Sequence, residues 1–278
     1  MATRTAIEWT EVTWNPTTGC DQISPGCDNC YALTMARRLK AMGAAKYQTD
    51  GDPATSGPGF GIATHPAALA EPYRWRTPRR VFVNSMSDLF HHAVPAAFIA
   101  DVFATMAMTP QHTYQILTKR PARARTLLND PDFQHQAWQR AAATDVNGWL
   151  GAAAHPPAAW PWPNVWIGVS VETAQQLHRI DHLRAIPTAV RFVSAEPLLG
   201  PLAGIDLTNV DWLIAGGESG PHARPLDLAW IRDLITACQT HGTAAFVKQL
   251  GTAWTGHRGK GTDPAAWPTD LQVRQWPT

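Results

Sequence analysis

The chain has 278 residues, of which 45% are hydrophobic and 16% are charged, and its formal net charge is +1. This length suits one large α/β domain or two small ones, and the hydrophobic content allows a large core. The charge excludes the strongly basic character of a general nucleic-acid-binding protein. No apolar run approaches the roughly 18 residues of a membrane span. Because the first ten residues lack the apolar core of a signal peptide, we expect a cytoplasmic protein without a membrane partner.

Seven short runs predict β-strands. Most of them are continuously apolar rather than alternating, which is typical of strands buried on both faces of a parallel sheet. They cover residues 11–14, 81–85, 114–118, 165–170, 190–194, 212–215 and 244–248.

Helical periodicity fills most of the intervals between these runs. The predicted helices cover residues 29–42, 95–108, 123–143, 173–185 and 227–241, the third being interrupted near Pro131. Strand–helix alternation predicts right-handed βαβ units, and therefore an α/β fold with a partial (β/α) TIM-like barrel of about six to seven parallel strands. We expect residues 1–278 to form a single domain. Loop insertions are predicted at 43–80 and 143–164, and an irregular C-terminal tail at 252–278.

Three of the four cysteines lie in one short stretch, residues 14–31, which reads WNPTTGCDQISPGCDNCY. Cys20, Cys27 and Cys30 have the spacing C-x6-C-x2-C in a loop rich in glycine and proline. In a cytosolic chain such a cluster indicates metal or redox chemistry rather than disulfides. Three thiols leave one coordination position open, which fits a catalytic zinc or a 4Fe–4S cluster. The fourth thiol, Cys238, lies on an apolar helical stripe and is predicted to be a buried hydrophobic residue rather than a hydrogen donor.

Polar residues follow every predicted strand. In a parallel barrel these strand ends lie on one face, where active sites are built. Their mixture of acidic and basic groups suits a zwitterionic ligand. The candidates are Asn84, Ser85, Asp88, Lys119, Arg120, Ser170, Glu172, Ser194, Glu196, Gly216, Gly217, Glu218 and Lys248. No catalytic residue is assigned among them.

A basic run precedes the second predicted strand. It consists of Arg74, Trp75, Arg76, Arg79 and Arg80. Basic residues beside an aromatic ring can bind a nucleic-acid backbone and stack on bases. The same pattern is typical of a solvated loop with a packed tryptophan. The run makes nucleic acid the first partner to test.

The chain resembles the radical S-adenosylmethionine superfamily, because its cysteine loop leads from a first strand into a helix at the mouth of a predicted partial barrel. Within that superfamily it closely resembles the phage Gp37/Gp68-type family. The matching stretches, between residues 7 and 251, are WNPTTGC, CDNCYA, RRVFVNSMSDLFH, LTKRP, VWIGVSVE, FVSAEPLLGP, LIAGGESG and VKQLG. The usual superfamily spacing is C-x3-C-x2-C, and three further residues separate the first two cysteines here.

This resemblance implies that Cys20, Cys27 and Cys30 hold a 4Fe–4S cluster and that S-adenosylmethionine binds its open iron. Reduction by an electron donor would then give a 5′-deoxyadenosyl radical that abstracts hydrogen from a substrate, with nucleic acid as a candidate. The implied cofactor contacts are Asn84, Ser85 and Asp88 for the methionine amino group, Ser170, Glu172, Ser194 and Glu196 for ribose or carboxylate, and Gly216, Gly217 and Glu218 near adenine or ribose. Lys119 and Lys248 are candidates for carboxylate or substrate contacts.

A second hypothesis from a different class stays open. In it the three thiols hold zinc or an Fe–S cluster without catalysis, and the protein is a module that binds nucleic acid or a partner protein. Metal analysis separates the two hypotheses, because iron with acid-labile sulfide favours the enzyme and one zinc favours the module.

Overall fold

The computed structural model describes residues 3–144 and 159–278. The strands are β1 (Thr3–Arg4), β2 (Val12–Trp14), β3 (Thr17–Thr18), β4 (Ala63–Thr64), β5 (Arg80–Val83), β6 (Thr113–Thr118), β7 (Val165–Ser170), β8 (Val190–Ala195), β9 (Trp212–Gly216) and β10 (Ala244–Gln249). One sheet has the order β1-β2-β5-β6-β7-β8-β9-β10, and β3 pairs with β4 in a second, small sheet. The seven strands from β2 to β10 in the large sheet are parallel, whereas β1 joins its edge antiparallel to β2. The fold is therefore an α/β partial TIM-like barrel, as the sequence predicts.

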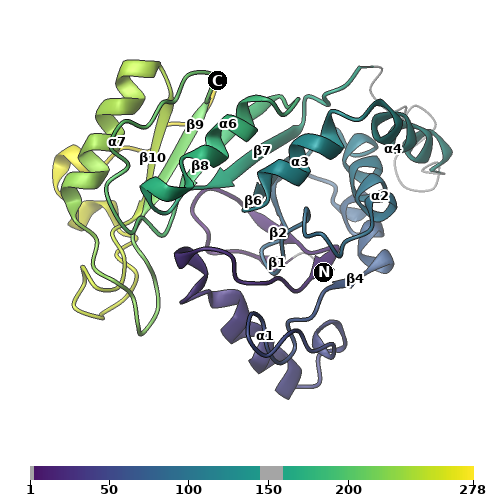
Figure 1. The fold of residues 1–278 in the computed structure, drawn as a ribbon, viewed down its shortest axis with the longest axis horizontal. Coiled ribbons are helices and arrows are strands. Elements are labelled where there is room, and N and C mark those ends of the chain that lie inside the picture. The colour runs from purple at the N-terminus through teal and green to yellow at the C-terminus, as the bar shows by residue number, and fades with distance from the viewer. Residues whose placement is uncertain (1–2, 145–158) are drawn as a thin grey trace. The chain divides into compact units, whose positions relative to one another are not determined.

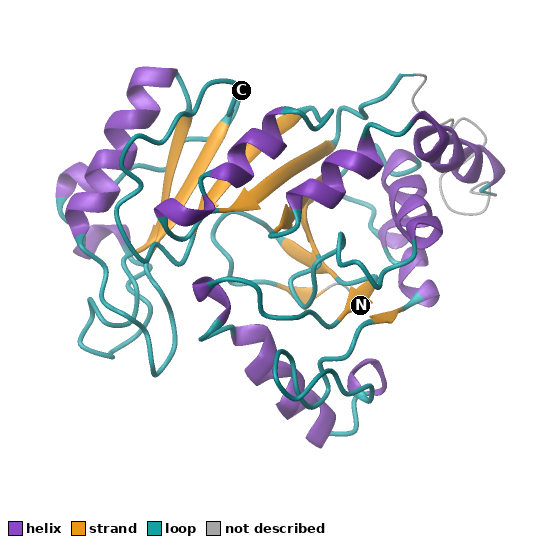
Figure 2. Cartoon of the chain, in the orientation of Figure 1, coloured by secondary structure: helices purple, strands orange, loops and turns teal. Residues whose placement is uncertain are grey.

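Helices alternate with the strands (Figure 2). They are α1 (Tyr31–Ala41), α2 (Ala96–Ala107), α3 (Pro121–Leu128), α4 (Pro131–Ala143), α6 (His178–Arg184) and α7 (Leu228–His241). Local signals fix their ends. The Asp130 and Asp227 side chains each accept a hydrogen bond from the backbone N–H two residues later, capping α4 and α7. Helix α7 ends at Gly242, whose φ of 69° is the left-handed conformation of a C-terminal cap.

The chain divides into two compact units. Unit 1 comprises Met1–Gln22, Ala32–Ile167 and Ile186–Ala189, and unit 2 comprises Ile23–Tyr31, Gly168–Ala185 and Val190–Thr278. The boundary therefore falls twice within the cysteine loop region, which assigns Cys20 to unit 1 and Cys27 and Cys30 to unit 2.

In unit 1, β2 pairs with β5, and β5 with β6, in parallel register. Helices α2 and α4 lie side by side (Figure 1). Their contact includes Phe103 of α2 edge-on to Phe133 of α4, with ring centroids 5.8 Å apart. Trp14 of β2 and Tyr114 of β6 are fully buried. This apolar packing supports the carboxyl ends of β5 and β6, where the polar residues of the candidate site begin.

In unit 2, β8 pairs with β9, and β9 with β10, again in parallel. Helix α7 packs against β9 and β10 (Figure 1). Trp212 stacks on Trp276 of the C-terminal segment, with ring centroids 4.9 Å apart, and donates its indole N–H to the Gln275 carbonyl oxygen. The end of the chain is thus held against the strands although it is irregular.

The seven predicted strands are confirmed, with shifts of one or two residues at their ends. The predicted helix over 123–143 is two helices, α3 and α4, because Pro131 begins a new helix after the Asp130 cap. Residues 173–185 form a short 3-10 turn followed by α6. Of the insertion predicted at 143–164, residues 145–158 lie outside the described residues. Residues 43–80, predicted as a loop insertion, contain 3-10 turns and the short strand β4. That the whole chain forms a single domain stays a prediction.

None of the helices in the described part of the chain combines the length and apolar character of a membrane span.

Candidate functional site

The loop that carries the three cysteines depends on close backbone packing at its start. Gly19 has a φ of 90°, and a Cβ atom there would lie 2.1 Å from the Gly61 carbonyl oxygen. Only glycine tolerates both conditions. Glycine is needed directly before Cys20, because the chain turns there beside the backbone of Gly61.

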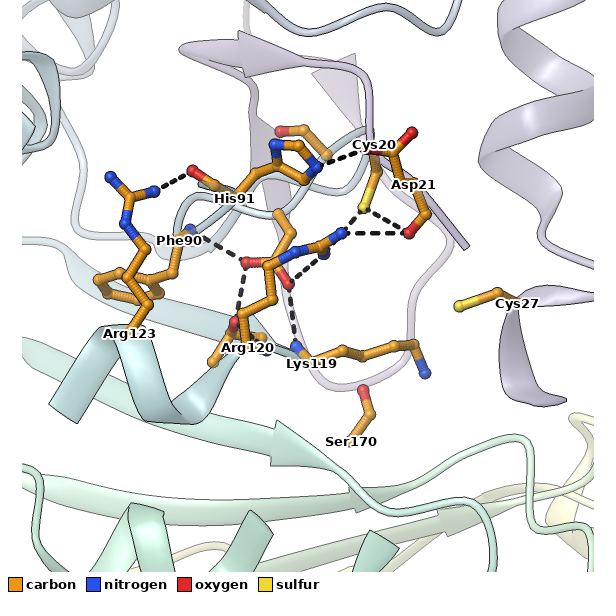
Figure 3. A network of polar contacts seen from close by, with 12 residues as sticks. Cys20, Asp21, Cys27, Phe90, His91, Lys119, Arg120, Arg123 and Ser170 are labelled. Atoms are coloured by element: carbon orange, nitrogen blue, oxygen red, sulfur yellow. Dashed lines mark hydrogen bonds and ion pairs between the residues drawn. The ribbon is translucent and has the colours of Figure 1, made fainter. Parts of the chain in front are cut away.

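Cys20 is contacted by an arginine. Arg120 donates from Nη1 to the Cys20 Sγ at 3.2 Å, and from Nη2 to the Asp21 carbonyl oxygen at 3.2 Å (Figure 3). Its side chain is 13% exposed. Burial acts to lower the pKa of Arg120, but the nearby Cys20 and Asp88 outweigh it and raise that pKa above its ordinary value. The guanidinium is therefore a permanent positive charge beside this sulfur.

Asp88 anchors that arginine. Its Oδ2 accepts from Arg120 Nη1 at 3.2 Å and from the Lys119 backbone N–H at 2.9 Å. Its Oδ1 accepts from the Thr118 hydroxyl at 2.8 Å and from the Phe90 backbone N–H at 3.0 Å. With four donors on two oxygens, this buried carboxylate is already well hydrogen-bonded within the protein. These contacts hold Arg120 in place, and the predicted contact of Asp88 to a methionine amino group stays a prediction.

Asp21 fixes the chain directly after Cys20. Its Oδ2 lies 2.8 Å from His91 Nε2, and its Oδ1 accepts from the Thr55 and Ser56 hydroxyls at 2.8 and 3.0 Å. Burial raises the pKa of Asp21, but these hydrogen bonds together outweigh it and leave the pKa below its ordinary value. His91 Nδ1 accepts from the Ala93 N–H, so its Nε2 carries the proton that Asp21 receives. The first part of the loop is thus tied to two other segments of unit 1.

The second part of the loop is held in unit 2 by Glu172. Glu172 is fully buried, and its Oε1 accepts from the Ser24 hydroxyl at 3.0 Å. Its Oε2 accepts from Arg179 Nη1 at 3.1 Å, and that nitrogen also donates to the Ser170 carbonyl oxygen. A Cβ on Gly26 would lie 2.4 Å from Glu172 Cγ, so the loop backbone passes directly over this carboxylate.

Glu218 and Arg224 hold the same part of the loop from another side. Glu218 Oε2 accepts from Asn29 Nδ2 at 3.0 Å, and Oε1 accepts from Arg224 Nη2 at 2.6 Å. Arg224 also donates to the Pro25 carbonyl oxygen at 2.8 Å and to Asp28 at 3.1 Å. Burial raises the pKa of Glu218, but hydrogen bonds from Arg224 and Asn29 outweigh it and lower that pKa. These contacts surround the short 3-10 turn Pro25–Cys27 and the residues before Cys30.

The remaining charged candidates in unit 2 are paired with each other. Lys248 Nζ forms a short ion pair with Glu196 Oε1, and the Gln249 amide also donates to that oxygen at 3.4 Å. Gly217 follows β9, and a Cβ there would lie 2.5 Å from the Leu250 carbonyl oxygen. This glycine is therefore required by packing against the segment after β10, whatever its role toward a ligand.

The other predicted residues lie at strand ends, as expected. Asn84 follows β5 with a φ of 64° and is buried, and Ser85 donates to the Asn15 side-chain oxygen at 3.3 Å. Ser170 and Ser194 are buried at the ends of β7 and β8. Lys119 follows β6 and Gly216 ends β9, each within its own unit. Roles toward a ligand stay predictions for all of them.

The basic run divides by exposure. Arg74 and Arg76 are exposed, and Arg79 and Arg80 are half-buried. Trp75 is only 8% exposed and lies edge-on to His112, with ring centroids 5.4 Å apart. A buried ring cannot serve as a platform for bases. Trp75 is therefore a packed tryptophan in a loop whose arginines lie at the surface.

All four cysteines are thiols. Across residues 3–144 and 159–278, no group of three or more His, Cys, Asp or Glu side chains is gathered as metal ligands. The chemistry of the donor set nevertheless fits an Fe–S cluster, since thiolates are its ligands and N–H donors around their sulfurs are a usual part of such sites. Cys238 differs, because it is buried on α7 and burial raises its pKa to about 12.

The contacts of Arg120 and Arg224 are not indicated by the sequence. Arg120 follows the third predicted strand among other strand-end charges, with no partner indicated by the sequence, and Arg224 follows the last of the GGESG glycines without a motif of its own. Their partners are 100 and 196 residues away along the chain. The only sequence signal was the position of Arg120 directly after a strand.

The overall fold is similar to that of solved structures of spore photoproduct lyase. One single-substitution variant has a TM-score of 0.50 at 10% sequence identity, covering 90% of this chain and 79% of that chain. Another variant has a TM-score of 0.47 at 12% identity, over 89% of this chain and 78% of that chain. A double variant with bound AdoMet and dinucleoside spore photoproduct has a TM-score of 0.46 at 11% identity, over 90% and 79%.

The chain belongs to the family described as "Protein of unknown function (DUF5131)", whose model matches residues 4–276. No curated protein matches the sequence.

Proposed function

We propose that this protein is a radical S-adenosylmethionine enzyme in which Cys20, Cys27 and Cys30 hold a 4Fe–4S cluster. The observation that carries the proposal is the set of three thiols on one loop between β2 and α1, with Arg120 donating to the first sulfur. The fold likeness to spore photoproduct lyase at a TM-score of 0.50 supports it. So does the resemblance of the sequence motifs to the radical S-adenosylmethionine superfamily.

Such a cluster, when bound, supplies the electron that cleaves S-adenosylmethionine to a 5′-deoxyadenosyl radical. The chain's own part is to hold the cysteines in place. Asp21 and Arg120 fix Cys20, and Glu172, Glu218 and Arg224 fix the segment around Cys27 and Cys30.

Cofactor contacts in this proposal come from polar side chains and glycines at the strand ends. They are Asn84, Ser85, Lys119, Ser170, Ser194, Gly216 and Gly217. Buried hydroxyl and amide groups and close backbone approach suit a polar nucleoside ligand. Asp88, Glu172, Glu196 and Glu218 act in the proposal mainly through their protein partners.

For the substrate we propose nucleic acid. The exposed Arg74 and Arg76, with Arg79 and Arg80 beside them, offer a local basic surface in unit 1 on a chain of near-zero net charge. The reaction also requires a low-potential electron donor. The narrower assignment to the phage Gp37/Gp68-type family stays a prediction, since the matching model is that of the family described above.

The test is anaerobic purification followed by assays of iron, acid-labile sulfide and 5′-deoxyadenosine formed from S-adenosylmethionine and dithionite. We expect about four irons and four sulfides per chain, and deoxyadenosine from the reduced protein. Single Cys20→Ala, Cys27→Ala and Cys30→Ala variants should lose most of the iron. Cys238→Ala, a substitution of the buried thiol on α7, is the matched control and should retain it.

Two outcomes would overturn the proposal. One zinc per chain without sulfide would favour the non-catalytic metal-binding module. An intact 4Fe–4S cluster that gives no deoxyadenosine with several reductants would leave a cluster protein that does not cleave S-adenosylmethionine.

A further inference from the structure

Arg120 contacts three groups at and around the first cysteine of the loop. It stands at the junction of β6 and α3, where its backbone N–H donates to the Thr118 hydroxyl at 2.9 Å. From there its guanidinium reaches Cys20 Sγ, the Asp21 carbonyl oxygen and Asp88 Oδ2, each at 3.2 Å (Figure 3). All four groups belong to unit 1. A single planar group therefore joins the sulfur, the loop backbone and a buried carboxylate.

The anchor of this arginine is rigid. Asp88 is 5% exposed and receives hydrogen bonds from the backbone N–H groups of Phe90 and Lys119 as well as from the Thr118 hydroxyl. A carboxylate fixed by backbone donors holds the guanidinium in one orientation. The Arg120 N–H group therefore stays directed at the sulfur rather than sampling solvent.

A donor directed at a ligand sulfur changes the energetics of a cluster. Reduction adds negative charge, and a positive group or an N–H at the sulfur stabilises the more negative state. Hydrogen bonds to cluster sulfurs are among the factors that set the reduction potential. They also orient the ligand, as partners beyond the metal ligands generally do.

We propose that Arg120 is a positioning residue that holds Cys20 for cluster binding and shifts the cluster's reduction potential to a more positive value. The shift in reduction potential rests on the proposed function. The holding of Cys20 concerns the metal-free protein as well. Asp88 acts through Arg120 and not on the cluster itself.

Arginine is needed here for its shape as well as its charge. Its planar fork presents separate N–H groups to the sulfur, to the Asp21 carbonyl oxygen and to Asp88. A lysine at this position would keep the charge and lose the fork. Glutamine would keep one amide donor and lose the charge. The two substitutions therefore separate electrostatics from hydrogen bonding.

The first measurement uses the metal-free protein. Amide hydrogen exchange in residues 19–22 should be about tenfold faster in Arg120→Ala than in the wild type, because a charge-assisted hydrogen bond to the loop is lost. Arg123→Gln is the matched control, since Arg123 donates to the His91 and Val94 carbonyl oxygens rather than to the Cys20 sulfur or the Asp21 carbonyl oxygen. Unchanged exchange in Arg120→Ala would overturn the positioning role.

The second measurement is a potentiometric titration of the reconstituted cluster, followed by electron paramagnetic resonance. We expect a more negative midpoint potential in Arg120→Ala, a smaller shift in Arg120→Lys and Arg120→Gln, and no shift in Arg123→Gln. If Arg120→Ala does not retain iron, the lysine and glutamine variants carry the comparison. A wild-type potential in variants with full iron content would overturn the tuning role.

The wild type separates this inference from the proposed function. Absence of iron and sulfide in the wild-type protein would sink the proposed function and the potential shift together, while the exchange measurement would still decide the positioning role. A cluster in the wild type, with the same midpoint potential in the Arg120 variants, would contradict only the proposed shift in reduction potential.

Discussion

The two parts of the cysteine loop are held in different ways. In residues 17–22, which belong to unit 1, an arginine donates directly to the cysteine sulfur, and the aspartate after it is tied to His91, Thr55 and Ser56. In residues 23–31, which belong to unit 2, the described contacts of Glu172, Glu218 and Arg224 go to Ser24, Pro25, Asp28 and Asn29. In the first part an arginine contacts the thiol itself. In the second part the two carboxylates and Arg224 contact residues beside the thiols, and the Ser24 hydroxyl lies 3.8 Å from the Cys27 Sγ.

The second part shows that a carboxylate at a strand end can hold the cysteine loop by hydrogen bonds rather than bind a ligand. Glu172 and Glu218 follow β7 and β9, as a cofactor-binding residue of a barrel would. Each nevertheless accepts a hydrogen bond from the loop and one from an arginine. Substitutions in the two parts should therefore give distinguishable effects.

The largest effect is expected from the buried ion pair under the second part. Arg179 and Glu172 are 6% and 0% exposed in their side chains. Arg179→Ala would leave a buried carboxylate without its cation, which should lower the free energy of unfolding by about 3–5 kcal/mol. Denaturant titration measures this loss. Arg184→Ala on the same helix removes ion pairs to the exposed Asp181 and Asp206 and hydrogen bonds to the Asp206 and Thr208 carbonyl oxygens, and should cost clearly less because its acidic partners are exposed. Equal losses in the two variants would contradict the assignment.

The next effect concerns the first part of the loop. Gly19→Ala adds a Cβ that meets the Gly61 carbonyl oxygen and forces a left-handed conformation on alanine. We expect a loss of about 3 kcal/mol in unfolding free energy. We also expect faster hydrogen exchange in residues 17–22. Gly43→Ala is the control, because Gly43 has a similar φ of 74° and a Cβ atom there would meet no other atom within 4 Å. It should cost about 1 kcal/mol, and a similar loss in both variants would show that strain alone matters.

A smaller effect is expected from the half-exposed arginine of the second part. Arg224→Ala removes donors to Glu218, to Asp28 and to the Pro25 carbonyl oxygen. We expect a loss of about 1.5–3 kcal/mol and faster exchange confined to residues 23–31. Exchange in residues 17–22 should be unchanged. Spread of the effect into that segment would remove the distinction between the two parts.

The same cluster predicts a pH dependence. The folded-state pKa of Glu218 lies below its ordinary value, so its stabilisation is complete above the unfolded pKa of about 4.3. It is lost as the pH falls through the folded pKa. The wild type should therefore lose stability below about pH 4.3 more steeply than Glu218→Gln. Parallel curves for the two proteins would argue against an ionised Glu218 in contact with the loop.

The smallest effect is expected at the fourth thiol, Cys238, where the prediction concerns chemical reactivity rather than stability. The pKa of Cys238, raised to about 12 by burial, predicts that it stays unmodified by iodoacetamide at pH 8 in the native protein. Cys20 and Cys30, which are half-buried, should react in the metal-free protein. Peptide mass spectrometry after brief labelling gives the order. Early labelling of Cys238 would contradict its buried place on α7.

Much of the fold could be predicted because apolar runs such as residues 165–170 have no polar face, which is typical of strands buried on both faces of a parallel sheet. The break at Pro131 was predicted for a similarly local reason. Strand β1 was missed because two residues carry no pattern. For the site, the three cysteines and the strand-end positions could be read from spacing. The partners of Arg120 and Arg224 could not, since they are set by packing between segments about 100 and 200 residues apart.

The six residues between Cys20 and Cys27 bear on how this loop can be re-engineered. Four of them are themselves attachment points. Asp21 and Gln22 are held by His91 and the Thr55 carbonyl oxygen, and Ser24 and Pro25 by Glu172 and Arg224. Cutting the interval to three residues, the spacing usual in the radical S-adenosylmethionine superfamily, would remove an attachment together with the length. A shortened loop would therefore need a new means of fastening. In this chain the spacing between Cys20 and Cys27 cannot be shortened without also losing hydrogen bonds that hold the loop.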